Sequence, residues 1–178
     1  MDEWTRLAYA ARDGGGRPAL EDLVRAVHDD VWRLCAHLGD RDRADDLAQE
    51  TYVRVMRSLP GFRGESPVRA WLFGIVRRVV ADDIAARQRR RRTSSVATRV
   101  PAVSPDHQGS VALEHLLGCL DDERRAAFVL TQVLGYSYAE AAATCGVPVG
   151  TIRSRVARAR GVLVAMLGEP ASTKAAAS

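Results

Sequence analysis

The fold of this chain is decided by residues 136–160, which read YSYAEAAATCGVPVGTIRSRVARAR. Ser137 can cap a short helix that begins at Tyr138, and Gly146 suits the tight turn that ends such a helix. Pro148 stands near the start of a second helix, whose inward stripe recurs every three or four residues and consists of Ile152, Val156, Ala159 and Leu163. Two helices joined by a glycine turn at this spacing predict a helix-turn-helix.

The second helix of this motif carries a polar and basic outer face. Its members are Thr151, Arg153, Ser154, Ala157, Arg158 and Arg160, with Arg155 at the margin. Presented end-on, such a helix fits the major groove of DNA, where its first turn can meet a phosphate and its arginines can meet base edges. Residues 150–160 alone would indicate a solvated amphipathic helix, and it is the preceding helix and turn that favour DNA.

The rest of the chain also shows helical periodicity. Apolar residues recur every three or four positions through residues 20–38, 43–59 and 67–92, and no stretch alternates like a strand bounded by hairpin turns. The third of these helices is expected to have Ser66 as its N-cap and Pro67 as its first residue. We therefore predict an all-α fold of two small helical domains.

The domain boundaries follow from composition. Residues 94–110 contain two prolines and four serines without a helical period, which indicates a flexible linker. The expected division is an N-terminal extension over 1–19, a first domain over 20–93, the linker, a second domain over 111–168 and a disordered tail over 169–178.

Charge is distributed unevenly along this chain, whose net charge is +4. Residues 67–92 hold eight arginines against two aspartates, whereas residues 40–50 hold five acids against two arginines. The arginine-rich segment favours a polyanionic partner, because arginine supplies planar donors to phosphates and guanine edges. The acidic segment is suited to docking on a basic partner helix.

Other functional classes find no support in the sequence. The three cysteines and four histidines are not at metal-ligand spacing, no nucleophile-and-base pattern stands out, and no apolar run is long enough to span a membrane. The first residues also lack the charge pattern of a secretory signal. We expect a cytoplasmic protein that is not an enzyme and binds no metal or cofactor, with reduced and mostly buried thiols.

Two separate stretches resemble one family of proteins. Residues 43–84, RADDLAQETYVRVMRSLPGFRGESPVRAWLFGIVRRVVADDI, resemble region 2 of the extracytoplasmic function (ECF) sigma factors, and residues 136–160 resemble their region 4. The resemblance covers roughly residues 20–165, and a linker with no domain between the two regions is typical of this group. It implies a protein that binds core RNA polymerase, directs it to promoters and initiates transcription.

The resemblance also implies three sets of site residues. The set expected to bind the beta-prime clamp helices of core polymerase is Asp45, Asp46, Leu47, Gln49 and Glu50. The set for the melted minus-ten element, where aromatic faces and cations together suit single-stranded DNA, is Phe62, Arg63, Gly64, Glu65, Ser66, Trp71, Arg77 and Arg78. The set for the minus-thirty-five duplex is Pro148, Thr151, Arg153, Ser154, Ala157 and Arg158. Many relatives carry asparagine where this chain has Arg78, and Trp71 is equally suited to a core position.

Two other interpretations stay open on the sequence alone. A stand-alone helix-turn-helix regulator would bind duplex DNA without polymerase, but it leaves residues 40–92 without a role. An all-helical interaction protein would bind polymerase or another sigma factor and have no sequence-specific affinity for DNA. The resemblance further implies the beta flap of polymerase as a partner of region 4 and allows an anti-sigma factor, which no feature of the sequence identifies.

Overall fold

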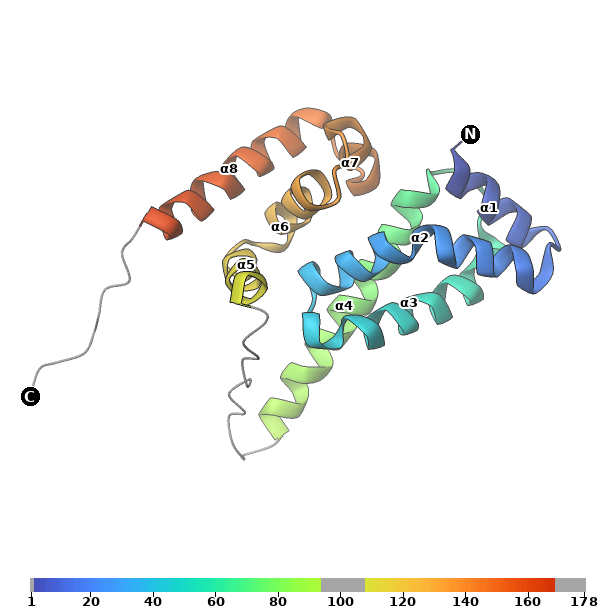
Figure 1. Ribbon diagram of the computed structural model, residues 1–178, viewed down its shortest axis with the longest axis horizontal. Helices are drawn as coiled ribbons and strands as arrows, with labels where there is room; N and C mark the ends of the chain where they lie inside the picture. Colours follow the sequence, from blue (N-terminus) through green and yellow to red (C-terminus); the bar gives the residue numbers. More distant parts are fainter. Residues whose placement is uncertain (1, 94–107, 169–178) are drawn as a thin grey trace, which may run out of the picture.

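The computed structural model describes residues 2–93 and 108–168, and in these ranges the chain consists of helices and their connections (Figure 1). The elements in chain order are α1 (Glu3–Arg12), α2 (Gly16–Leu38), η1 (Arg41–Arg43), α3 (Ala44–Ser58), η2 (Leu59–Gly61), α4 (Val68–Thr93), α5 (Gln108–Gly118), α6 (Asp122–Phe128), η4 (Val129–Val133), α7 (Tyr138–Cys145) and α8 (Val149–Gly168). No strand occurs within the described ranges. The predicted all-α fold is confirmed.

The first domain packs α1 to α4 around one apolar core. The recurring inward positions of the helix expected over residues 43–59 are all buried, and they are Ala44, Leu47, Ala48, Thr51, Val55 and Leu59. In α2, Leu23, Val27 and Val31 are buried as their spacing predicts. Leu20 and Val24 are only half-buried, because they line an open groove on the first half of this helix.

The helix α4 begins one residue later than expected. Pro67 takes the capping position in place of Ser66, and its carbonyl accepts hydrogen bonds from the amides of Ala70 and Trp71 at 2.9 and 3.1 Å. Further along, the Arg87 guanidinium lies 2.7 Å from the carboxylate of Asp40. This member of the arginine-rich segment therefore ties α4 to the turn after α2.

The second domain packs α5 to α8 around a smaller core. Leu117, Leu130 and Ile152 are among its fully buried side chains. The segment η4 is a single π turn that continues α6 directly, and the Tyr136 amide then donates to the Leu130 carbonyl at 2.9 Å to close the loop before α7. Asp121 caps α6 by accepting from the Arg124 amide at 2.9 Å, and this fixes where that helix starts.

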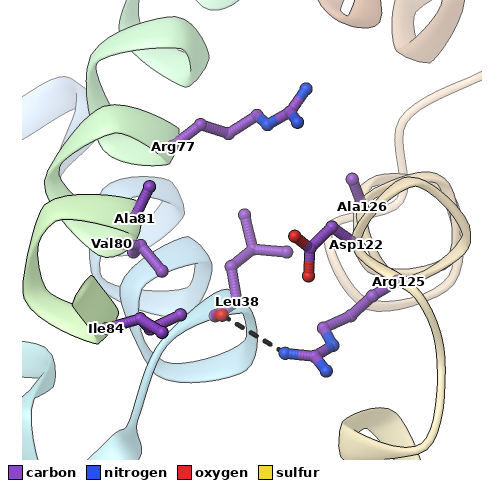
Figure 2. A pocket seen from close by; sticks show the side chains of 8 residues that line it. All are labelled: Leu38, Arg77, Val80, Ala81, Ile84, Asp122, Arg125 and Ala126. Carbon is purple, nitrogen blue, oxygen red and sulfur yellow. Dashed lines mark hydrogen bonds between the residues drawn. The ribbon is translucent and has the colours of Figure 1, made fainter. Parts of the chain in front are cut away.

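The two domains touch along the side of α2 and the first half of α4 (Figure 1). The Tyr136 hydroxyl donates to the Asp30 carboxylate at 2.8 Å, and the Arg69 guanidinium stacks 4.8 Å from the Tyr136 ring centre. Arg125 donates to the Leu38 carbonyl at 3.4 Å (Figure 2). Burial raises the pKa of Tyr136, and the neighbouring Asp30 charge raises it further. A buried tyrosine, Arg69 and Arg125 therefore help to join the domains, and Arg41 adds an ion pair to Glu114 of α5 at 3.9 Å.

The boundaries differ in part from those expected. The helix α5 begins at Gln108, inside the range 94–110 expected to be linker, while 94–107 and the expected tail 169–178 lie outside the described residues. The thiols are not mostly buried: Cys35 is buried, Cys145 is half-buried and Cys119 is exposed, because Cys119 follows the end of α5 in a short surface turn. Within the described ranges, no helix combines the length and apolar character needed to cross a bilayer.

Candidate nucleic-acid interface

The second helix of the helix-turn-helix, α8, is held in place by α7 and by its own apolar stripe. A capping box starts α7: the Ser137 hydroxyl accepts from the Glu140 amide at 3.2 Å, and the Glu140 carboxylate accepts from the Ser137 amide at 2.9 Å. These bonds lower the pKa of Glu140. Gly146 ends the helix at φ +66°, a conformation that glycine adopts without strain. The predicted cap and turn are both present.

The apolar stripe of α8 faces inward as predicted. Ile152, Val156 and Ala159 are almost fully buried, and Leu163 closes the stripe at the far end of the core. The opposite face is solvent-exposed at Arg153, Ser154, Ala157 and Arg158, and Thr151 is half-buried. Because the stripe is fixed, the outward face cannot rotate away from solvent without breaking the domain core.

The arginines of α8 fall into two groups. Arg155 pairs with Glu123, and Arg160 donates to the Gln132 side chain at 2.7 Å, so both are engaged with the preceding α6 and η4 segment. Arg153 and Arg158 make no side-chain hydrogen bond or ion pair to any other described residue. The helix therefore directs two unpaired guanidinium groups to solvent on a rigid support.

The start of α8 is open. Pro148, Val149 and Gly150 are exposed, and a methyl group placed on Gly150 would meet no atom within 4 Å. The Ser154 hydroxyl donates to the Thr151 carbonyl at 2.9 Å, which leaves its lone pairs free to accept a further bond. An exposed helix N-terminus next to two unpaired arginines is suited to a DNA backbone and to base edges in one groove.

Six of the eight residues expected to bind the melted element line one hollow. Phe62, Arg63, Gly64, Glu65, Ser66 and Trp71 surround an open pocket of about 400 Å³ between η2 and the start of α4. Arg63 and Glu65 are exposed, and Trp71 is half-buried with its ring 5.0 Å from that of Phe62. Phe62, which also lines the pocket, is itself only 5% exposed.

The remaining two residues of that set lie on different faces of α4. Arg77 lines another pocket, of about 80 Å³, together with residues of α2 and α6 (Figure 2). Arg78 is exposed and follows Trp71 by seven positions, or about two helical turns, so the two share a face about 10 Å apart. Gly74 lies between them, and a methyl group added to it would meet no atom within 4 Å. Arg78 therefore lies on the same face of α4 as Trp71 but outside the hollow, and Arg77 is an exposed residue at the pocket between the domains.

The face of α3 expected to bind polymerase divides into free and engaged groups. Asp46 and Gln49 are exposed, and no hydrogen bond or ion pair ties their side chains to another described residue. Asp45 accepts from the Trp32 indole at 2.9 Å. Leu47 is 3% exposed and belongs to the core, so in this conformation it holds the helix in place.

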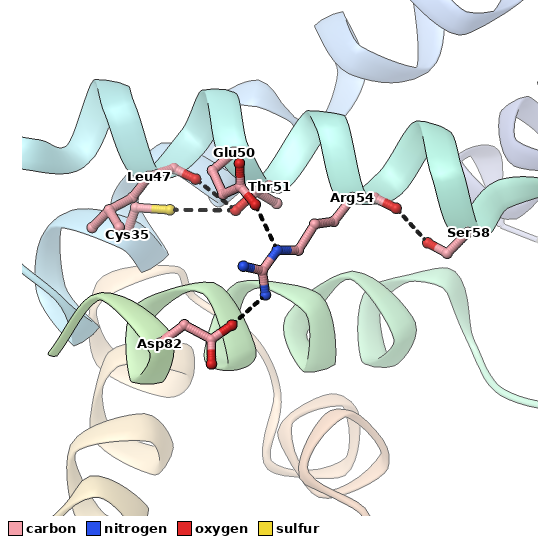
Figure 3. Close-up of polar contacts among 7 residues, drawn as sticks. All are labelled: Cys35, Leu47, Glu50, Thr51, Arg54, Ser58 and Asp82. Carbon is pink, nitrogen blue, oxygen red and sulfur yellow. Dashed lines mark hydrogen bonds and ion pairs between the residues drawn. The ribbon is translucent and has the colours of Figure 1, made fainter. Parts of the chain in front are cut away.

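Glu50 belongs to a charged chain across two helices (Figure 3). Its carboxylate lies 2.8 Å from Arg54, and Arg54 reaches Asp82 on α4 at 2.6 Å. These two hydrogen bonds raise the pKa of Arg54, the bond to Glu50 more than the bond to Asp82. These ion pairs fix α3 against α4 and leave the Glu50 side chain 46% exposed at the edge of the acidic face.

Sequence reasoning missed two residues beside the hollow, Tyr9 and Arg12 of α1. The Arg12 guanidinium donates to the Phe62 carbonyl at 2.8 Å, and the Tyr9 ring lies 5.8 Å from the Phe62 ring. One sequence signal was available for the helix itself: Asp2 caps it by accepting from the Thr5 amide at 3.0 Å. No cluster of three metal-ligating side chains occurs within the described residues.

Comparison with known proteins assigns both domains to one family. Residues 23–91 match the family described as Sigma-70 region 2, and residues 110–163 match Sigma-70, region 4. The chain is 46% identical over 166 residues to the ECF RNA polymerase sigma factor SigC of Mycobacterium tuberculosis, covering 90% of this chain and 89% of that protein. It is 39% identical over 159 residues to the ECF sigma factor EcfG of Rhodopseudomonas palustris, covering 82% and 87% of the two chains.

Solved structures agree with this assignment. CnrH in complex with the cytosolic domain of CnrY matches with a TM-score of 0.73 and 28% identity, over 93% of this chain and 97% of that one. The sigma factor RpoE in complex with the anti-sigma factor NepR from Bartonella quintana matches with a TM-score of 0.65 and 32% identity, over 83% and 95%. The chain therefore belongs to the ECF RNA polymerase sigma factors of the sigma-70 family, which initiate transcription at promoters.

Proposed function

We propose that this non-enzymatic initiation factor reads the minus-thirty-five duplex with the outer face of α8 and the melted minus-ten strand with the hollow beside α4. The observation that carries the proposal is the division of the arginines on α8, since Arg153 and Arg158, which have no partner among the described residues, face solvent from the helix that follows the turn. On this proposal, residues 20–93 bind the minus-ten element and core polymerase, and residues 111–168 bind the upstream element.

For the upstream element, the proposed contacts combine position and readout. The open first turn at Pro148 and Thr151 would bind a phosphate, and this fixes the register of the helix on the duplex. Arg153, Ser154 and Arg158 would then contact base edges, with arginine favouring guanine. Ala157 presents only a methyl group at the centre of this face, so it limits what the helix can contact there to apolar groups such as the thymine methyl.

For the melted element, we propose that one unstacked base enters the hollow lined by residues 61–66 and Trp71. The strand would continue along α4 over Gly74, where no side chain obstructs it, toward Arg78. A stacking surface followed by a cation at about 10 Å suits a base and a nearby phosphate of a single strand. Arg77 lies on the side of α4 that borders the other domain, where this exposed residue would add positive charge near the strand.

We propose that the acidic face of α3 binds the beta-prime clamp helices of core polymerase, through Asp46 and Gln49 first. These side chains are exposed and carry no internal partner among the described residues, so binding them costs no internal bond. Asp45 and Glu50 would add to the negative electrostatic potential of this face while they remain bonded to Trp32 and Arg54. Region 4 would contact the beta flap. Because core polymerase acts on the chromosome, we place the protein in the cytoplasm.

Run-off transcription tests this assignment. Purified core polymerase, genomic DNA fragments and the protein should give discrete new start sites that core polymerase alone does not give. The double variant Asp46→Asn/Gln49→Ala should lose these starts and the affinity for core polymerase, with an unchanged melting temperature. Asp22→Asn is the matched control, since it removes one exposed carboxylate from α2 outside the proposed face. Binding of duplex promoter sites without any new starts would instead support a stand-alone regulator.

We also propose an anti-sigma factor as a partner. The support is that CnrH and RpoE, whose solved structures are complexes with CnrY and with the anti-sigma factor NepR, match this chain across both domains. A partner of this kind, added to the run-off reaction in an equimolar amount, should abolish the new starts and should be displaced by excess core polymerase. Simultaneous binding of both partners with full transcription would contradict this proposal.

A further inference from the structure

The helix α1 lies outside the matched region 2, which begins at residue 23, yet it reaches the hollow proposed to read the minus-ten strand. It packs along α2 and also contacts η2 and α4 (Figure 1). Its inner residue Ala8 is completely buried, so the helix is docked on the first domain. The last turn of α1 then presents Tyr9 and Arg12 to the loop between η2 and α4.

Arg12 binds this loop through its main chain. Its guanidinium donates to the Phe62 carbonyl at 2.8 Å, while two other nitrogens hold the Asp13 carboxylate at 2.6 and 2.9 Å. The same guanidinium lies 4.6 Å from the centre of the Tyr9 ring, within the range of a cation–π contact. A planar fork is needed to make all of these contacts at once. The Phe62 carbonyl is therefore held by a cation that is itself fixed on two sides.

Tyr9 presses on the loop at Gly64. A methyl group built on Gly64 would lie 1.8 Å from the Tyr9 hydroxyl oxygen, so only glycine leaves room for that side chain. Gly64 also has φ +73°, a conformation that other residues adopt with strain. The glycine in the middle of the loop is thus required twice, once for its backbone conformation and once for the approach of Tyr9.

An aromatic series links α1 to the pocket wall. The ring of Tyr9 lies 5.8 Å from Phe62, and the ring of Phe62 lies 5.0 Å from Trp71, both tilted at about 45°. Rings in such contact constrain one another, because packed interiors tolerate few alternative arrangements. The three rings therefore form one packed series that runs from α1 to Trp71 in the wall of the hollow.

We infer that Tyr9 and Arg12 are positioning residues for the minus-ten reading loop: they fix the Phe62 carbonyl, Gly64 and the tilt of Trp71, and thereby determine which base the hollow accepts. The inference rests on the proposed function of that hollow and extends it to a helix that the family match does not include. It predicts that variants of α1 change base preference at the melted element. The affinity for core polymerase and for the upstream duplex should stay unchanged, because the described contacts of α1 do not include the proposed faces of α3 and α8.

The experiment uses holoenzyme assembled from core polymerase and the full chain. Fluorescent non-template oligonucleotides carry the downstream element found by run-off transcription, with each of the four bases placed in turn at every position. The readout is the ratio of dissociation constants between the preferred and the least preferred base. Arg12→Ala should lower this ratio about tenfold or more, given the usual strength of a bond from a charged donor. Tyr9→Ala should lower it as well, because the ring contact to Phe62 is lost. Tyr9→Phe should retain the ratio, because the ring contacts remain.

Two comparisons separate positioning from general stability. Arg6→Ala is the matched control, because Arg6 is an exposed arginine of the same helix and no side-chain contact ties it to the loop. Arg12→Lys keeps the charge but cannot reproduce the fork, so it should not rescue the ratio. Variants that lower the melting temperature but leave the base ratio at the wild-type value would overturn the inference. The Arg12 side chain is 26% exposed, so Arg12→Ala serves as the test if Tyr9→Ala fails to fold.

A double variant tests the contact at Gly64 directly. Gly64→Ala alone should abolish the base preference, because its methyl group meets the Tyr9 oxygen. Tyr9→Phe/Gly64→Ala should recover part of it, because the nearest atom then becomes a ring carbon at 3.0 Å. Equal losses in the single and double variants would contradict the role given to Tyr9. A wild-type holoenzyme without any base preference would instead refute the proposed reading of the minus-ten strand, and the inference with it.

Discussion

Removing the two unpaired arginines of α8 should separate promoter reading from folding. Arg153 and Arg158 are exposed and have no ion pair or side-chain hydrogen bond within the described part of the chain. Surface substitutions of this kind change the free energy of unfolding by about 0.5 kcal/mol or less. Arg153→Ala and Arg158→Ala should therefore leave the melting temperature and the affinity for core polymerase unchanged.

The expected loss of promoter affinity is much larger. A bidentate contact from arginine to a base edge is worth about 1–3 kcal/mol of discrimination. At about 1.4 kcal/mol for each tenfold change, one substitution should weaken use of the matching upstream element roughly 5-fold to 150-fold. If one of these arginines contacted only a phosphate, its removal would weaken binding to all sequences equally and would lower the slope of the salt dependence by about one unit.

The assay compares transcription from a promoter with its upstream element intact and from the same promoter with that element scrambled. The wild-type protein should favour the intact promoter, and each variant should lose that preference while it keeps its activity on the scrambled template. Arg160→Ala is the control within the same helix, because it removes the same charge from a side chain engaged with Gln132. An equal loss on both templates, or an equal loss in the control, would refute the assignment of α8.

Three further predictions follow from other parts of the molecule. Burial lowers the pKa of His37 below its ordinary value of 6.5, and the charges of Arg41 and Arg33 lower it further. Because the unfolded chain then binds more protons than the folded protein, the free energy of unfolding should fall as the pH drops below about 6.5. Chemical denaturation at a series of pH values should show a flatter dependence on pH for His37→Gln. Exposed Cys119 should be the first cysteine to react with a thiol reagent at pH 8. Burial raises the pKa of Cys35 to about 11, so Cys35 should react only when the protein unfolds. Rapid labelling of Cys35 in the native protein would contradict its buried position. Tyr136→Phe removes the hydrogen bond to Asp30 between the domains, so it should weaken the association of the domains by about 1–2 kcal/mol, or roughly 5-fold to 30-fold. A pair of fluorophores, one on each domain, should then report a larger fraction of molecules with separated domains. An unchanged distance distribution would show that this hydrogen bond does not hold the domains together.

The sequence by itself determined the helices, their inward stripes and the family. The spacing in residues 136–160 predicted the cap at Ser137, the turn at Gly146 and the buried stripe of α8, all of which are present. Such features are local, because a helix repeats every 3.6 residues and a cap lies within one turn of what it caps. The resemblance of residues 43–84 and 136–160 to sigma factors was likewise carried by contiguous motifs and is confirmed by the family matches.

Only the tertiary structure decided which candidate residues are free to act. Leu47 lies in the motif expected to bind polymerase but is buried in the core, and Arg77, although exposed, lines the pocket next to the second domain and not the hollow. The sequence also gave no reason to connect Arg12 with Phe62, fifty residues away along the chain. Contacts of this kind arise from how amphipathic helices pack on one another, and periodicity shows only that a face is buried, without showing what covers it.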